Sequence, residues 1–290
     1  MGGKSKQNMP FKQAKKQGDL TMKMVKKIFM GLAALAMVAG LVGCIPNDDT
    51  ENIITGNNGH CKVDYTYETE DGTATYRAYK STILSHAGAL VKITINKNEE
   101  SGNSKMGVIF GLKERTENKK KLRDFNIIGI GSGTSANYYV STLKNIENLQ
   151  AENFGATPDA AEGPTEQEWV KLANGKITYP STAVAEDGTI TVYIWYQATK
   201  EGSYKWAILD MTEDQATAWK NLKAEKAAGD IPTATKILAS GTITDAFDAV
   251  ESDDKIKKGK ISFYAMVKGT KTLTGSWDVV GTYLEAEDAE

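Results

Sequence analysis

Apolar and polar residues alternate along most of this chain, and this alternation is the feature that most restricts its fold. Clear examples are the segments Val63 to Tyr67 and Val91 to Ile95, in which every second residue is apolar. A period of two places alternate side chains on opposite faces of a β-strand. About ten such segments follow one another, separated by turn-forming residues. The pattern therefore predicts an all-β fold, an antiparallel and jelly-roll-like β-sandwich, rather than βαβ units.

One segment departs from this alternation and predicts a single short surface helix. Thr212 and Gln215 have the spacing of a capping box, in which each side chain bonds to the backbone N–H of the other residue. Trp219 and Leu222 are three residues apart, so we expect both to dock on the sheet from one helix face. Gly229 is a suitable residue for ending the helix.

The N-terminal segment has the layout of a secretory signal. Three lysines, at positions 23, 26 and 27, precede an uncharged apolar run from Ile28 to Leu41. This run is shorter than the roughly 17–25 residues that a membrane span needs. The next residues, Leu41-Val42-Gly43-Cys44, resemble the lipobox of bacterial lipoproteins. The resemblance implies that Cys44 is lipidated, becomes the new N-terminus and anchors the protein to a membrane through its acyl chains.

This interpretation divides the chain into three parts. Residues 1–43 are a signal peptide that starts at Met1 or, if the start is misassigned, at Met22 or Met24. Residues 44–60 hold the lipidated Cys44 and a flexible tether rich in Asn, Asp and Gly, and residues 61–290 form the β-sandwich domain. Ile45 follows Cys44 at the position where Asp signals retention in the inner membrane of proteobacteria. The absence of Asp favours anchoring in the outer membrane over the inner membrane, so we expect a protein of the cell envelope.

Charge is distributed unevenly along the chain. Residues 1–43 contain eight Lys and one Asp, so the remaining 247 residues hold 35 − 8 = 27 Lys and Arg against 37 − 1 = 36 Asp and Glu. The mature chain would carry a net charge of −9, which argues against nucleic acid as a partner. It would retain Cys61 as its only thiol, so it could form no internal disulfide.

The stretch from Met106 to Leu149 resembles concanavalin-like and laminin-G-like sandwiches. An apolar strand (MGVIFGL), a glycine-containing strand (FNIIGIG) and an aromatic strand (YYVSTL) follow one another as they do in those folds. The resemblance implies a β-sandwich and, because such folds often bind sugars, a carbohydrate ligand.

An aromatic hairpin is the candidate binding site. If residues 199–202 form a four-residue loop between the strands 189–198 and 204–211, Trp195 faces Trp206, Tyr193 faces Ile208, and Tyr204 lies on the same side. One face would then be core, and the other would present Tyr193, Trp195, Tyr204 and Trp206 for stacking on sugar rings or on a partner protein. In the alternative arrangement both faces are buried, one under a second sheet and one under the helix of Trp219.

The sequence offers no recognisable catalytic or metal-binding motif. Two histidines and no G-x-S-x-G leave nucleophilic catalysis unsupported, and a zinc site needs more ligands than His60 and Cys61. We therefore expect a protein without cofactor or metal that binds or adheres at the cell envelope. Two alternatives stay open: a glycan hydrolase whose fold brings two carboxylates together, and a structural or assembly lipoprotein that contacts another envelope protein.

Overall fold

A computed structural model describes residues 53–57, 59–67, 75–96, 104–117, 119–132, 135–146, 168–199, 203–222, 230–244, 259–268 and 271–283. Residues 52–290 form one compact unit. The predicted signal peptide, the lipidation site at Cys44 and the first part of the tether lie outside the described residues. Among the described helices, none is long and apolar enough to cross a membrane.

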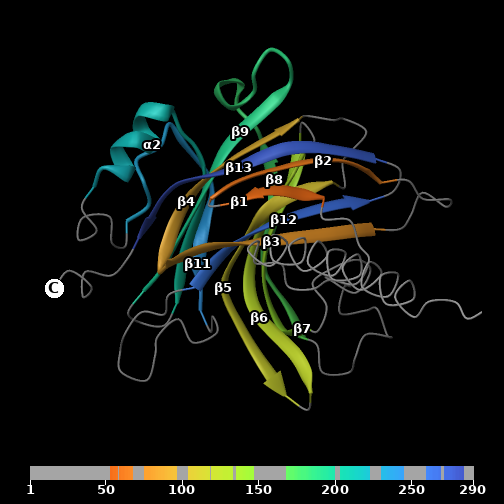
Figure 1. The fold of residues 1–290 in the computed structure, drawn as a ribbon. Coiled ribbons are helices and arrows are strands. Elements are labelled where there is room, and N and C mark those ends of the chain that lie inside the picture. The colour runs from red at the N-terminus through yellow and green to blue at the C-terminus, as the bar shows by residue number, and fades with distance from the viewer. Residues whose placement is uncertain are drawn as a thin grey trace, which may run out of the picture. The chain divides into compact units, whose positions relative to one another are not determined.

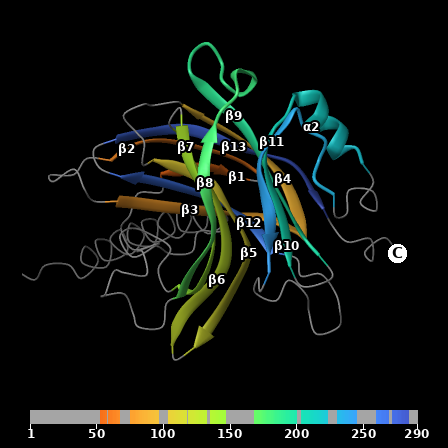
Figure 2. The ribbon, with the colours of Figure 1, turned by 180° about the vertical axis from the view of Figure 1, so that it is seen from behind.

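The described strands form two antiparallel sheets, as the alternation predicts (Figures 1 and 2). Sheet A has the order β1-β2-β13-β4-β9-β10-β11, and sheet B has the order β3-β12-β5-β6-β7-β8. The bounds in sheet A are β1 Ile54–Asn57, β2 His60–Tyr67, β4 Gly88–Asn96, β9 Thr189–Ala198, β10 Tyr204–Asp210, β11 Lys236–Ile243 and β13 Lys271–Tyr283. Those in sheet B are β3 Thr75–His86, β5 Lys105–Glu117, β6 Lys120–Gly131, β7 Ser135–Ile146, β8 Glu168–Thr178 and β12 Gly259–Lys268. The all-β, two-sheet fold class is thus confirmed.

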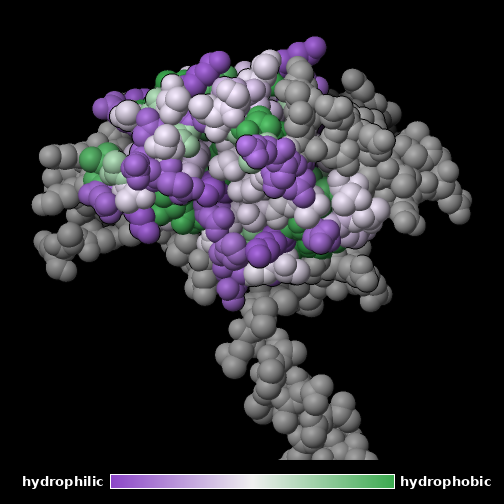
Figure 3. Space-filling model, turned by 90° about the horizontal axis from the view of Figure 1, so that it is seen from above, coloured by the Kyte–Doolittle hydropathy of each residue, from purple (hydrophilic) through white to green (hydrophobic). Residues whose placement is uncertain are grey.

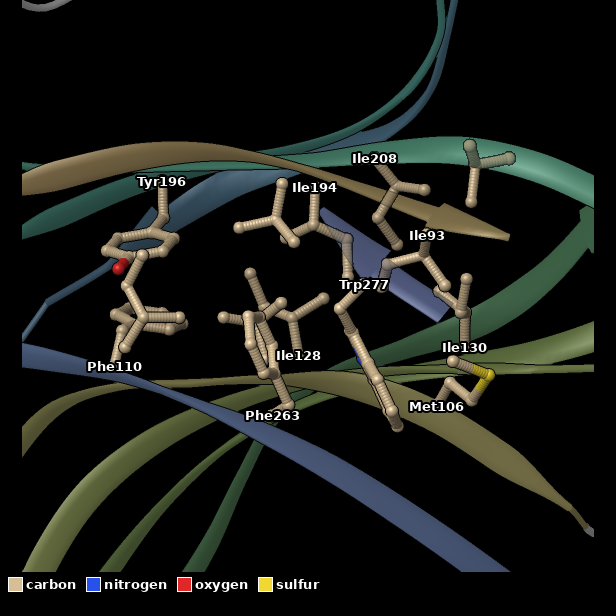
Figure 4. Close-up of a cluster of buried hydrophobic side chains, with 14 of the residues drawn as sticks. Ile93, Met106, Phe110, Ile128, Ile130, Ile194, Tyr196, Ile208, Phe263 and Trp277 are labelled. Carbon is tan, nitrogen blue, oxygen red and sulfur yellow. The ribbon is translucent and has the colours of Figure 1, made fainter. Parts of the chain in front are cut away.

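The main core lies between the two sheets and is filled by the inward residue of each alternating pair. Figure 4 shows Ile93, Ile194 and Ile208 from sheet A facing Ile128 and Phe263 from sheet B. Trp277 of β13 crosses this core, because its Nε1 donates a hydrogen bond to the backbone oxygen of Gly107 in β5 at 3.0 Å. Its indole also stacks on the ring of Phe263, with centroids 5.5 Å apart. This side chain therefore joins the two sheets by a polar bond and by ring packing.

Helix α2 (Glu213–Lys220) covers part of the outer face of sheet A. Its capping box is present as predicted, with the Gln215 N–H donating to Thr212 Oγ1 and the Thr212 N–H donating to Gln215 Oε1. Trp219 is buried against the sheet, but Leu222 lies beyond the last helical turn and is 45% exposed, so its predicted docking is wrong. Gly229 lies outside the described residues.

Two strands occupy segments in which the alternation predicts no strand. Strand β1 lies inside the predicted tether and pairs with β2, so the sandwich begins before residue 61. A short G-x-x-G turn explains this, because Gly56 and Gly59 both adopt a positive φ and allow the chain to reverse. Strand β8 pairs with β7 at the edge of sheet B, although Asn174 and Gly175 interrupt its apolar pattern.

Candidate functional site

The predicted aromatic hairpin exists, but its register differs by one residue from the expected one. Five residues, 199–203, join β9 to β10, and the Thr199 N–H donates to the Ser203 backbone oxygen at 2.8 Å. The extra residue places Ala207 opposite Trp195 and Tyr196 opposite Trp206. Because a shift of one residue moves each side chain to the other face of a strand, the four predicted binding residues are divided between two faces. The single aromatic face expected from the sequence is therefore wrong.

All four aromatic side chains are buried, as in the alternative arrangement. Tyr204 and Trp206 point into the main core, where the rings of Tyr204 and Phe110 meet edge to face at 5.1 Å. Burial raises the pKa of Tyr204 to about 12. Tyr193 and Trp195 point outward but lie under α2, with exposed fractions of 1% and 0%. None of these four rings offers an open face for stacking on a sugar.

A polar network holds the first turn of α2 on this side of sheet A. Lys92 of β4 forms an ion pair with Glu213, and the Tyr193 side chain hydrogen-bonds to Glu213 as well. Hydrogen bonding to Lys92 lowers the pKa of Glu213, whereas burial first and the charge of Glu213 second raise the pKa of Tyr193. The role of these residues is thus to position α2 over Trp195.

The outer face of sheet B, in contrast, carries a second apolar cluster. The buried members of this cluster are Ile109, Phe125, Ile127, Tyr139, Leu143, Ile146, Tyr264 and Met266. In the complete chain their exposed fractions lie between 0 and 9%. Among the other described elements, the strands of sheet A pack on the inner face of sheet B. Helix α2 packs on the outer face of sheet A, away from sheet B. An antiparallel sheet with a solvated outer face has polar residues at these positions, so this face is unusual.

Three tyrosines lie in one row across the centre of this outer face. Tyr79 of β3, Tyr264 of β12 and Tyr139 of β7 share the row with two directly paired glycines, Gly107 of β5 and Gly129 of β6. The Tyr139 ring lies on Gly129, because a Cβ at that glycine would be only 2.4 Å from a ring carbon. The absence of a side chain at Gly129 therefore lets the Tyr139 ring lie flat over β6.

Polar groups surround this row of tyrosines. Nζ of Lys105 lies 4.6 Å from the centroid of the Tyr139 ring, a cation–π distance. Ser141 points to the same side as Tyr139 and is 1% exposed, yet its hydroxyl has no hydrogen-bond partner. A buried hydroxyl without a partner is costly, by roughly 1–3 kcal/mol. Such a group indicates a place where a ligand could supply the missing bond.

We call this surface the tyrosine face and define it by the outward residues of six strands. They are Tyr79 of β3, Lys105, Gly107 and Ile109 of β5, Ile127, Gly129 and Gly131 of β6, Asn137, Tyr139 and Ser141 of β7, Lys171, Asn174 and Lys176 of β8, and Ser262, Tyr264 and Met266 of β12. Asn137, Lys171, Asn174 and Lys176 are exposed and form its β7–β8 border. The exposed large apolar side chains in the described ranges, Leu172, Leu222, Ile231 and Ile237, are scattered, and from above the described surface is mainly hydrophilic (Figure 3).

The described residues contain no group of three His, Cys, Asp or Glu side chains that could hold a metal ion. His60 and Asp278 form an exposed ion pair on sheet A. Cys61 is buried next to this pair, and burial raises the pKa of its thiol. The sequence-based expectation of a protein without metal, cofactor or catalytic residues stays a prediction.

Comparisons with known proteins give structural neighbours only. No protein-family model matches the sequence, and no curated protein matches it. A carbohydrate-binding module, CBM66 from Bacillus subtilis, is 8% identical over 76% of this chain and 92% of its own, with a TM-score of 0.32. A β-1,3-1,4-glucanase (lichenase) from a mouse hindgut metagenome is 10% identical over 78% and 81%, also at 0.32. The κ-carrageenase of Pseudoalteromonas carrageenovora is 6% identical over 79% and 80%, at 0.35. These TM-scores lie below 0.5, so the likenesses assign neither a family nor a ligand.

The sequence does contain a signal for the tyrosine face. In β5 and β6 the residues of both phases are apolar or glycine, as in Met106 to Phe110 and Ile127 to Ile130. A run that is apolar in both phases is typical of a strand buried on two sides. Which neighbour covers the second side depends on tertiary structure, so the tyrosine row does not emerge from the pattern alone.

Proposed function

We propose that this chain is a lipid-anchored cell-envelope protein that binds a carbohydrate across the tyrosine face without hydrolysing it. The observation that carries the proposal is the row of Tyr79, Tyr264 and Tyr139 on the outer face of sheet B. Tyr264 and Tyr139 are 1% and 8% exposed in the complete chain, so binding requires this face to become accessible. Tyrosine rings stack on the apolar faces of sugars while their hydroxyls hydrogen-bond. Asn137, Asn174 and the unpartnered Ser141 hydroxyl supply further hydrogen-bonding groups.

Binding rather than hydrolysis is supported by the residue types on the face. Glycosidases use two carboxylates that lie about 5–10 Å apart. None of the outward positions that define the tyrosine face carries Asp or Glu. The polar groups on this face are amides, hydroxyls and amines, which recognise hydroxyl-rich ligands but do not supply an acid and a base of the required kind.

The anchor proposed for Cys44 determines the form of the protein that would bind. We propose that the tyrosine face is accessible to a ligand in the mature chain of residues 44–290, although Tyr264 and Tyr139 are only 1% and 8% exposed in the complete chain. Hydroxyl-radical labelling of the mature chain tests this directly. We expect Tyr79, Tyr139 and Tyr264 to be labelled faster than the core residue Tyr196, which is 1% exposed. Equal protection of all four tyrosines would contradict an open face.

Binding is tested on a glycan array with the mature chain carrying Cys44→Ala, so that the protein is soluble. We expect retention on at least one class of glycan, and loss of retention in Tyr139→Ala and in Tyr264→Ala. Tyr65→Ala is the matched control, because Tyr65 is a half-buried tyrosine of sheet A. Folding of each variant is checked by circular dichroism. Unchanged retention in folded Tyr139→Ala and Tyr264→Ala would exclude the tyrosine face as the binding site.

A protein partner is the second candidate for the same face. Ile109, Ile127 and Leu143 are aliphatic, and they extend the apolar area beyond what sugar stacking uses. Protein interfaces have such an apolar core inside a polar rim. Crosslinking in the cell envelope, with a photoreactive residue in place of Leu112, would distinguish the candidates. A single crosslinked protein, together with no retention on glycans, would favour the partner protein.

A further inference from the structure

Strand β11 forms an accessible edge of sheet A. It is the last strand in the order of that sheet, and among the described strands it pairs only with β10 (Figure 2). Ser240, Gly241 and Thr242 are exposed in the complete chain, and Ile237 is 49% exposed. An edge strand presents a row of backbone N–H and C=O groups to which another strand can be added.

The other edges of the two described sheets have features that hinder the addition of a strand. In β8, Lys171 and Lys176 are exposed, and lysines on an edge strand discourage pairing. Strand β1 spans only four residues, and Nζ of Lys80 in β3 donates to the backbone oxygen of Ile54 in β1 at 3.3 Å, which ties these two edges together. Strand β11, in contrast, has neither a charged residue nor a proline from Ile237 to Ile243.

The two faces of β11 make this strand complementary to a second copy of itself. From Ala239 to Ile243 it follows β10 in regular register, so Ala239, Gly241 and Ile243 lie on the core side of sheet A. Ser240 and Thr242 lie on the outer side. Residues directly opposite each other in an antiparallel pair share a face. A two-fold axis at Gly241 satisfies this rule, because it places Ser240 opposite the second copy's Thr242 and Ala239 opposite the second copy's Ile243.

The residue types in these opposite pairs favour association. The hydroxyls of Ser240 and Thr242 are suited to a hydrogen bond across the two strands, and Ala239 and Ile243 continue the apolar core from one copy into the next. The Trp206 ring lies over Gly241 on the core side, because a Cβ at that glycine would be 3.0 Å from a ring carbon. No side chain of β11 therefore separates the two copies at the axis.

We propose that two copies of this chain pair through β11 and join their A sheets into one continuous antiparallel sheet with a two-fold axis at Gly241. The pairing is independent of the proposed carbohydrate binding, because it uses the edge of sheet A and none of the residues of the tyrosine face. Two strands of this length bury far less than the roughly 1,200 Å² of a stable interface. The dimer is therefore weak, with a Kd of roughly 10–100 µM.

Analytical ultracentrifugation of the mature chain carrying Cys44→Ala tests the proposal at concentrations from about 5 to 300 µM, which bracket this Kd. We expect the average mass to rise from monomer towards dimer. The variant Ser240→Lys/Thr242→Lys places like charges opposite each other in the proposed register, so its dimerisation should weaken at least about tenfold. The variant Ser240→Lys/Thr242→Glu places opposite charges there and should dimerise at least as tightly as the unchanged protein.

The matched control is Thr55→Lys/Asn57→Lys, which adds the same two charges at exposed positions of β1, the opposite edge strand of sheet A. We expect it to dimerise like the unchanged protein, and circular dichroism verifies that each variant is folded. An equal loss in the β1 and β11 lysine variants would overturn the proposal, and so would an equal loss in the two charge variants of β11. A chain that stays monomeric at all of these concentrations would exclude a second copy as the occupant of this edge. Species larger than a dimer would exclude the closed two-fold pairing.

Discussion

Replacing Trp277 by phenylalanine should destabilise the sandwich more than the same change at any other fully buried tryptophan. Trp277 is 0% exposed, and its Nε1 donates to the Gly107 backbone oxygen across the core at 3.0 Å. Phenylalanine keeps an aromatic ring but removes this donor from a buried acceptor, at a cost of about 1–3 kcal/mol. The smaller ring adds roughly 1 kcal/mol for lost contacts. The free energy of unfolding should therefore fall by about 2–4 kcal/mol.

Trp195→Phe is the matched control for this experiment. Trp195 is also 0% exposed, but its Nε1 is buried without a hydrogen-bond partner. Phenylalanine again loses roughly 1 kcal/mol of packing, but it removes an unpaired donor that costs about 1–3 kcal/mol to bury. The net change should be near zero or slightly stabilising.

Urea unfolding of the mature chain, followed by circular dichroism, measures both variants without relying on tryptophan fluorescence. The two changes should differ by at least about 2 kcal/mol, if the hydrogen bond of Trp277 has the value assigned to it. Equal destabilisation by the two substitutions, or a larger effect at Trp195, would refute the hydrogen-bond argument. Equal m-values are needed for the comparison, because a changed slope would mean a changed unfolded state.

Three further predictions concern the remaining features. Glu213→Gln should reduce the free energy of unfolding by a few tenths of a kcal/mol, since Lys92 pairs with an exposed carboxylate. Because the pKa of Glu213 is lowered in the folded state, this contribution is present above pH about 4.3 and is lost as the pH falls further. Urea titrations at pH 7 and pH 3 would measure this difference. In the soluble Cys44→Ala protein, Cys61 should react with a thiol reagent far more slowly when folded than in urea, because it is buried; rapid reaction of the folded chain would contradict its burial. In cells, Cys44→Ala should release the protein from membranes, and continued partitioning into the detergent phase would exclude the lipid anchor.

Local signals in the sequence predicted local structure well. The capping box of Thr212 and Gln215 involves atoms only three residues apart, so its geometry follows from the chain itself. Alternation located most strands for the same reason. The register of the hairpin was not predictable in this way, because the Thr199–Ser203 turn takes one residue more than the simplest loop. That single residue separates Trp195 from Trp206 and removes the aromatic face expected from the sequence.

The tyrosine face could not be predicted because its members come from strands that are distant in sequence. Tyr79, Tyr139 and Tyr264 meet only through the order β3-β12-β5-β6-β7, which places the ends of the domain side by side. Each tyrosine alone is compatible with any half-buried strand position. The alternation shows that a residue points to one of two faces, but not which residues of other strands share that face.

The two outer faces of the sandwich use their aromatic residues differently, and this difference supports the location of the proposed site. On sheet A the chain covers Tyr193 and Trp195 with its own helix, and Lys92 fixes the helix at Glu213. On sheet B no described helix covers Tyr139 and Tyr264, and these rings pack among apolar side chains beside a border of amides, hydroxyls and lysines. Burying aromatic rings within the fold requires only shape, whereas a binding face also requires polar groups that gain partners from the ligand. Ser141, with its unpartnered hydroxyl beside Tyr139, is such a group.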